Sequence, residues 1–108
     1  MAMTSCVDFC KALSDETRQR ILQVLQEKGE VCVSDLVGMV NVSQPTISHH
    51  LMLLKNARLV NSRREGKQVF YSIDRANVLT CCGMLFAKFA PGDAHLSGVM
   101  IPFSKVAE

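Results

Sequence analysis

The chain has 108 residues, the length of one domain, and 48% of them are hydrophobic while 20% are charged. This composition excludes a disordered chain, and no apolar run of about 18 residues could form a transmembrane span. The net charge of +2 is uneven: residues 55–75 carry six basic and two acidic side chains, whereas residues 1–54 carry four basic and six acidic ones. Such a basic block favours a polyanion-binding surface over a merely solvated face.

The N-terminus, MAMTSCVDFCK, has neither the basic nor the apolar region of a signal peptide, which predicts a cytoplasmic protein. In a reducing cytosol, the five cysteines are expected to be free thiols, metal ligands or redox switches rather than structural disulfides. The sequence contains no glycine-rich phosphate loop and no plausible acid–base pair. It therefore does not indicate an enzyme.

Two helices are predicted at the start of the chain. Thr4 or Ser5 is a suitable N-cap for a first helix of about two turns. Ser14 is a suitable N-cap for a second helix, which begins DETR, and Gly29 is a plausible stop at its C-terminal end. Both segments place apolar residues at helical spacing, which predicts one buried face on each helix.

The next two predicted helices form a helix-turn-helix. Ser34 is expected to cap the first of them and Asn41 to end it. Ser43 is expected to cap the second, with Pro45 in its first turn, where a missing amide proton costs little. The buried stripe of this last helix is formed by Ile47, Leu51 and Leu54. A short turn between two such helices is typical of a DNA-binding motif.

A hairpin and a long helix are predicted after this motif. Residues Leu59–Arg63 and Gln68–Ile73 alternate like strands, and Arg64–Lys67 forms the turn of a basic β-wing. Asp74 is expected to cap a helix over about residues 75–89, whose apolar stripe predicts an oligomer interface. The expected fold is therefore mainly α with a small β-hairpin, a winged helix-turn-helix domain over residues 1–90. Residues 91–108 are expected to form a loosely ordered tail.

This order of elements resembles the ArsR/SmtB family over roughly residues 9–74. The resemblance is carried by the phrases ALSDETRQRILQVL, EVCVSDL, SQPTISHHLMLLKNARLV and REGKQVFYSID. Members of this family are bacterial winged-helix repressors that sense metal ions, metalloids or thiol chemistry. The resemblance implies a homodimer formed through the first and last helices. It also implies that the dimer binds a palindromic operator in double-stranded DNA and releases it when an effector binds.

The expected DNA contacts come from the fourth helix and the wing. The N-terminal half of that helix would enter the major groove, where polar side chains read base edges; its candidates are Gln44, Thr46, Ser48 and His49. The wing would meet phosphates or the minor groove; its candidates are Arg63, Arg64 and Lys67. Lys55 and Arg58 are expected to add backbone contacts, whereas His50 lies closer to the buried stripe and is expected to pack.

Two effector sites known from the family are incomplete in this chain. Arsenic and cadmium sensors often carry a Cys-x-Cys in the phrase that here keeps Cys32 but has Ser34 in the second position. A serine hydroxyl is a poor ligand for a soft metal. The family's zinc site requires an Asp-x-His start to the last helix, which here begins Asp74–Arg75–Ala76. Zinc, nickel or cobalt sensing is therefore not expected.

The remaining cysteines are the predicted inducer site. Cys6 and Cys10 lie one helical turn apart on one face, and Cys81 and Cys82 are adjacent on the last helix. Because the family's first and last helices meet at the dimer interface, these two pairs could combine. Trivalent arsenic takes about three thiolates, and cadmium or mercury two to four. The expected inducer is As(III) or another thiophilic ion that folding does not require, with Cys32 ranked below the other four.

Other interpretations stay open. The cysteines could be only small core residues, or a pair of them could respond to persulfide or peroxide by closing a disulfide or polysulfide link. Three or more clustered thiols favour a metalloid, whereas only two in reach of each other favour redox sensing. A winged helix that binds protein instead of DNA would have an apolar or acidic recognition face, which this chain lacks. A thiol enzyme would need a cysteine in an anion-binding loop, and none is present.

Overall fold

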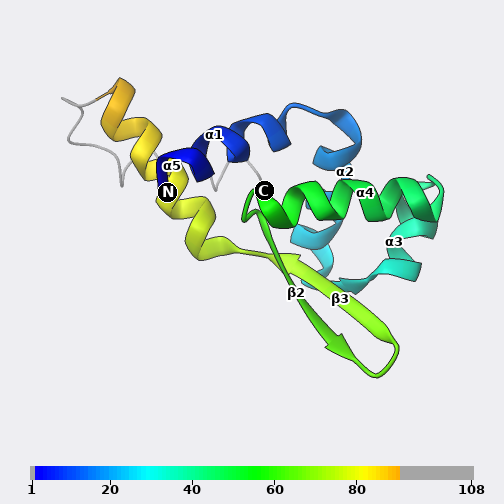
Figure 1. Cartoon of the computed structure of the whole chain (residues 1–108). Coiled ribbons are helices and arrows are strands. Elements are labelled where there is room, and N and C mark those ends of the chain that lie inside the picture. The colour runs from blue at the N-terminus through cyan, green and yellow to red at the C-terminus, as the bar shows by residue number, and fades with distance from the viewer. Residues whose placement is uncertain (1, 91–108) are drawn as a thin grey trace.

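The computed structural model of the protein describes residues 2–90, with side chains from Cys6 onward. The tail predicted over residues 91–108, with His95, lies outside the described residues. The described elements follow the chain in the order α1 (Ala2–Leu13), α2 (Glu16–Lys28), β1 (Glu30–Cys32), α3 (Val33–Val40), α4 (Gln44–Asn56), β2 (Val60–Glu65), β3 (Gln68–Ile73) and α5 (Arg75–Phe89). They form the predicted winged helix-turn-helix architecture (Figure 1).

The start of the first two helices differs from the prediction. Helix α1 begins at Ala2, ahead of both Thr4 and Ser5, so neither is its N-cap. The N-cap of α2 is Asp15 instead of Ser14, because the Asp15 carboxylate accepts a hydrogen bond from the Arg18 amide at 3.0 Å. The Ser14 hydroxyl instead donates to the Lys11 carbonyl at the end of α1. Two adjacent capping residues competed for one position, and the charged one occupies it.

The segment before α3 contains a strand that the sequence pattern did not predict. Residues Glu30–Cys32 pair antiparallel with β3, with Val31 opposite Tyr71. Helix α3 consequently begins at Val33, and the N-cap position is held by Cys32, without a side-chain hydrogen bond, rather than by Ser34. A strand of three residues is too short to show a period of two, and its pairing partner lies far along the chain. The predicted end of α3 at Asn41 is confirmed, with φ +65°.

Helix α4 has the predicted cap and the predicted buried face. The Ser43 hydroxyl accepts a hydrogen bond from the Thr46 amide, and a proline lies in the first turn. The predicted stripe is buried, with at most 1% of each residue exposed: Ile47, Leu51 and Leu54. This burial fixes which side of α4 faces the solvent.

The wing is a tight hairpin within a three-stranded antiparallel sheet of order β1-β3-β2. Glu65 pairs with Gln68, so the turn contains only Gly66 and Lys67 and is shorter than the predicted segment Arg64–Lys67. Gly66 has φ +64°, a backbone conformation that the first position of such two-residue turns requires. The hairpin extends away from the helices, and its far end is free (Figure 1).

The hydrophobic core lies between α2, α3 and α4, and α1 and α5 pack at its edge. Its most deeply buried side chains are Ile21, Leu25, Leu36, Ile47, Leu51, Leu54 and Cys81. Large apolar side chains remain exposed on the two edge helices: Val7 at 55%, Leu79 at 55% and Phe89 at 75%. Among the described residues, no helix combines the length and apolar character that crossing a membrane demands.

Candidate nucleic-acid interface and thiol site

The polar face of α4 is open to solvent. All four predicted base-reading residues are exposed: Gln44, Thr46, Ser48 and His49. Ser43 donates a hydrogen bond from its hydroxyl to Thr46 Oγ1 at 2.9 Å, which orients that side chain at the helix start. The buried stripe on the other side of α4 leaves these polar groups no partner in the core. They are therefore available to a ligand that approaches the helix.

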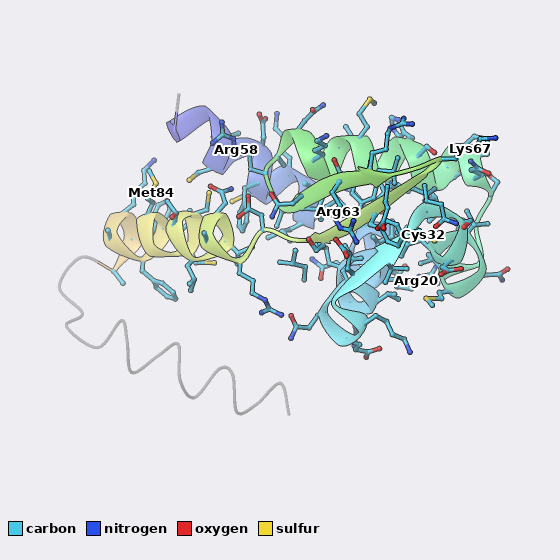
Figure 2. All side chains as sticks on the ribbon, turned by 90° about the horizontal axis from the view of Figure 1, so that it is seen from below. Arg20, Cys32, Arg58, Arg63, Lys67 and Met84 are labelled. Atoms are coloured by element: carbon cyan, nitrogen blue, oxygen red, sulfur yellow. The ribbon has the colours of Figure 1, made fainter. Side chains whose placement is uncertain are left out.

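A groove joins the start of α4 to the wing. Its volume is about 340 Å³, and it is bordered by Gln44 and Ser48 of α4 and by Lys67 and Gln68 at the end of the hairpin. Figure 2 shows Lys67 at the tip of the wing, beside the helices. The predicted base-reading and phosphate-contacting residues thus face one continuous surface, which we call the DNA face. It comprises the exposed side of α4 and the wing tip.

The basic residues of this region fall into two groups. The side chains of Lys55, Arg64 and Lys67 are exposed, and no ion pair involves them within the described part of the chain. Arg63 differs, because its guanidinium donates to both oxygens of Glu30 at 2.7 and 2.9 Å and to Glu65 at 2.8 Å.

Arg63 holds the base of the wing together. Its guanidinium spans β3, 4.8 Å above the centroid of the Phe70 ring, and joins β2 to Glu30 on β1. The hydrogen bonds to Glu30 and then Glu65 raise the guanidinium pKa, and the same contact lowers the pKa of Glu30. The sequence pattern showed only a cation here. The predicted contact of Arg63 with DNA stays a prediction, and the structure adds a contact within the wing.

A hydrogen-bonded link runs from α1 to α4 through Arg18. The Arg18 guanidinium donates from Nε to the Ala12 carbonyl at 2.9 Å and approaches Nδ1 of His50 with Nη1 at 3.2 Å. Burial lowers the His50 pKa, and the nearby guanidinium lowers it further against an opposing effect of Asp15. His50 is half-buried, as predicted, and in its neutral form it accepts the hydrogen bond from Arg18.

The structure brings one pair of the predicted sensor thiols into contact. The Sγ atoms of Cys6 on α1 and Cys81 on α5 are 3.1 Å apart, and the two residues are 6% and 1% exposed. Burial, assisted by the Cys6 thiol, raises the pKa of Cys81 to about 11. Burial also raises the pKa of Cys82, followed by the proximity of Cys10 and Cys6. All five cysteines are free thiols.

The other predicted thiols are less closely placed. Cys10 is exposed and Cys82 is half-buried. Within residues 2–90, no three or more Cys, His, Asp and Glu side chains are grouped closely enough to hold a metal ion. The predicted four-cysteine site is thus a single contacting pair, Cys6 and Cys81, in one chain. The sulfur of Met84, 3.7 Å from Cys6 Sγ, is a neighbour that a search confined to cysteines missed.

Cys32 lies apart from this pair. It is buried at the start of α3, and its Sγ is 3.3 Å from Ser34 Oγ. It borders the groove between α4 and the wing (Figure 2). This position agrees with its separation from the predicted sensor cysteines.

Known proteins identify the fold and its family. Residues 15–62 match the family described as "Bacterial regulatory protein, arsR family". An uncharacterised HTH-type transcriptional regulator of Methanocaldococcus jannaschii is 48% identical over 66 residues, which cover 61% of this chain and 74% of that protein. The chain belongs to the ArsR family. Its relatives are named as transcriptional regulators, in agreement with the expectation that the chain is not an enzyme.

Two further ArsR relatives are named for resistance to toxic ions. A cadmium resistance transcriptional regulatory protein CadC homolog of Staphylococcus aureus is 50% identical over 68 residues, covering 63% of this chain and 56% of that protein. The arsenical resistance operon repressor of Escherichia coli is 45% identical over 67 residues, covering 62% of this chain and 57% of that protein. The matched part of the chain thus spans little more than half of each of these two relatives.

A solved ArsR-type structure has the same arrangement of elements. The homodimeric winged helix-turn-helix domain of a Mycobacterium bovis protein, a possible ArsR-family regulator, superposes with a TM-score of 0.66 at 26% identity. The match covers 86% of this chain and 86% of that one. It therefore includes the wing and the edge helices, beyond the segment matched by the family.

Proposed function

We propose that this ArsR-family protein is a homodimeric repressor that binds operator DNA and releases it when a thiophilic effector binds Cys6 and Cys81. The observation that carries this proposal is the buried contact of these two thiols at 3.1 Å between α1 and α5. The two helices that share it also carry the exposed apolar side chains. A chemical event at the thiols would therefore act on the expected subunit interface.

The DNA face supports binding of a duplex. Helix α4 presents polar side chains that can pair with base edges in the major groove, and the wing tip presents Arg64 and Lys67 for phosphates. Arg63 would act mainly on the wing itself, because its charge is already paired with Glu30 and Glu65. The wing would then be held at a fixed angle to α4 before DNA binds.

The apolar edge helices support a dimer. An apolar groove of about 530 Å³ lies between α1, α2 and α5, with Phe9, Val78 and Leu79 among its lining residues. A second groove of about 320 Å³ between α1 and α5 is bordered by Val7 and Phe89. Exposed apolar surface of this kind marks an interface, and a second copy would cover it. The homodimeric structural relative supports the same assembly.

The spacing of the thiol pair suits a shared thiophilic ion. With metal–sulfur bonds of about 2.3 Å and angles of roughly 90–110°, two ligating sulfurs lie about 3.2–3.8 Å apart. The 3.1 Å separation of Cys6 and Cys81 is close to this range. As(III) is the leading candidate, with Cd(II) and Hg(II) next, and relatives named for arsenical and cadmium resistance support this class. Cys10 or Cys82 would supply a further thiolate, in the same protomer or in its partner.

Arg18 provides a path from the thiols to the DNA face. It holds the Ala12 carbonyl at the end of α1 and reaches His50 on α4. A shift of α1 caused by an ion between Cys6 and Cys81 would pull on this link and change how α4 is presented. Linkage then requires that DNA and effector weaken each other's binding by the same factor.

The test is operator release measured by fluorescence anisotropy on the protein's own promoter, with separate additions of As(III), Cd(II), Hg(II) and Zn(II). We expect release by thiophilic ions and none by zinc. Cys6→Ser and Cys81→Ser should each abolish release while leaving operator affinity unchanged, and Cys32→Ser serves as the matched control that still responds. If Cys32→Ser alone abolishes release, the effector site lies at the start of α3 and our assignment is wrong.

A redox-responsive repressor is the second candidate, and the presence of only two contacting thiols favours it. An oxidant such as peroxide would take two electrons from Cys6 and Cys81, form the S–S bond and yield two molecules of water per peroxide. A persulfide would instead build a polysulfide link. Intact-mass spectrometry separates these cases, because a disulfide lowers the mass by two hydrogens while bound arsenic raises it.

A further inference from the structure

We propose that Met84 completes a three-sulfur site with Cys6 and Cys81, and that this site binds a soft monovalent cation, Cu(I). This inference rests on the proposed function, since it names the effector class of the same thiol pair. Cu(I) would be bound by two thiolate sulfurs and one thioether sulfur. Soft ligands of these two types select Cu(I) over harder divalent ions.

The three sulfurs already lie together. Cys6 Sγ is 3.1 Å from Cys81 Sγ and 3.7 Å from Met84 Sδ. Cys81 and Met84 are three residues apart on α5, so they share the helix face that contacts α1. Figure 2 shows Met84 on the side of α5 that faces α1. Three sulfurs around one ion at about 2.3 Å would be about 3.2–4.0 Å apart, which requires only small side-chain adjustments.

The surroundings of the trio disfavour hard metal ions. Among the described residues, no cluster of three or more Cys, His, Asp and Glu side chains is present that could replace the sulfurs as a ligand set. Zinc, which prefers four nitrogen, sulfur or oxygen ligands, is therefore poorly served. Trivalent arsenic prefers thiolates and would gain little from a thioether. Met84 would thus shift the selectivity of the pair toward ions that accept thioether sulfur.

The charge around the site suits a monovalent ion. Binding of Cu(I) to two thiols releases two protons to the solvent and leaves a complex with a net charge of −1. The groove that opens onto Cys6 and Met84 is also bordered by Lys11 and Lys88, whose ammonium groups would offset that charge. The same groove, about 320 Å³ in volume, gives the ion a route to the buried sulfurs.

The test compares the reduced wild-type chain with Met84→Leu, which keeps the side-chain volume but removes the sulfur. Cu(I) affinity is measured anaerobically by competition with a coloured Cu(I) chelator, with Ag(I) as a second probe, and X-ray absorption counts the sulfur ligands. We expect three sulfurs in the wild type and two in Met84→Leu, with a loss of affinity of at least about tenfold. Met39→Leu, at an exposed site on α3, is the matched control and should bind Cu(I) like the wild type.

The outcomes separate this inference from the proposed function. Equal Cu(I) affinity in Met84→Leu and wild type, or a Cu(I) site with nitrogen or oxygen ligands, would overturn the role of Met84. If As(III) still releases the operator in that variant, the sensor pair stands without it. Three-sulfur Cu(I) binding with no change in operator affinity would confirm the metal site and overturn its function as the sensor.

Discussion

The protonation state of Cys81 makes the stability of the fold dependent on alkaline pH. Burial raises the pKa of this thiol from its ordinary 9.0 to about 11, so the folded chain favours the protonated form. The resulting stabilisation is fully present below pH 9 and is lost as the pH rises through 11. We expect the free energy of unfolding to fall by on the order of 2 kcal/mol across this window.

Urea unfolding at several pH values between 8 and 11, under reducing conditions, measures this effect. Lysines and Tyr71 also titrate in this range, so the quantity to compare is the slope of stability against pH in wild type and in Cys81→Ala. The variant should be less stable at pH 8 but lose less stability on going to pH 11. Parallel curves for the two proteins would show that Cys81 is not the titrating group.

At the scale of the element, Arg18 should be required for coupling rather than for binding. Its guanidinium joins the last turn of α1 to His50 on α4, and both contacts lie outside the thiol pair and the DNA face. We expect Arg18→Lys to bind effector and operator within about threefold of wild type, while release of the operator falls by about tenfold, close to 1.4 kcal/mol of coupling.

Gln19→Ala is the matched control for Arg18→Lys. The Gln19 side chain donates to the Leu13 carbonyl at the end of α1, so it links α2 to α1 in a similar way but makes no hydrogen bond to α4. This variant should retain full release. His50→Asn keeps an acceptor near the position of Nδ1 and should restore part of what His50→Ala loses. Equal loss of release in the Arg18 and Gln19 variants would mean that simple anchoring of α1 matters, rather than the contact with His50.

The elements differ in how well the sequence predicted them, and the reason is the range of the interactions that form them. Helices α4 and α5 were predicted with their caps, because Ser43 and Asp74 bond to amides three residues ahead. Strand β1 was missed because it exists only through pairing with β3, about 40 residues away. The site followed the same rule: cysteine spacing identified candidates, but only the packing of α1 against α5 selected Cys6 and Cys81 and added Met84.

At the scale of the whole molecule, the exposed apolar side chains of α5 predict a dimer in solution. Leu79 and Phe89 are 55% and 75% exposed in the single chain, and a stable interface should bury more than about 1,000 Å². We expect Leu79→Asp to shift the protein from dimer to monomer in sedimentation velocity at micromolar concentration. Met39→Asp introduces the same charge at an exposed site on α3 and should remain dimeric. A monomeric wild type would contradict the predicted assembly.

Binding of the assembled protein to DNA should depend steeply on salt. If the wing tips meet phosphates, the logarithm of the operator affinity falls linearly with the logarithm of salt concentration, with a slope of several units. Replacing Arg64 and Lys67 with alanine should flatten that slope and weaken binding to all sequences alike. Replacing His49 with alanine should leave the slope and reduce the difference between operator and random DNA. Affinity independent of salt would contradict the proposed DNA face.

The separation of the thiol pair from the DNA face determines how fast the protein can respond. Cys6 and Cys81 lie where α1 meets α5, while the free end of the wing lies at the other side of the molecule (Figure 1). An effector therefore does not compete with DNA for the same surface and can reach a repressor that is still seated on its operator. Induction then proceeds through a ternary complex that dissociates faster, so that adding effector to preformed complex should raise the dissociation rate constant itself, in proportion to effector occupancy.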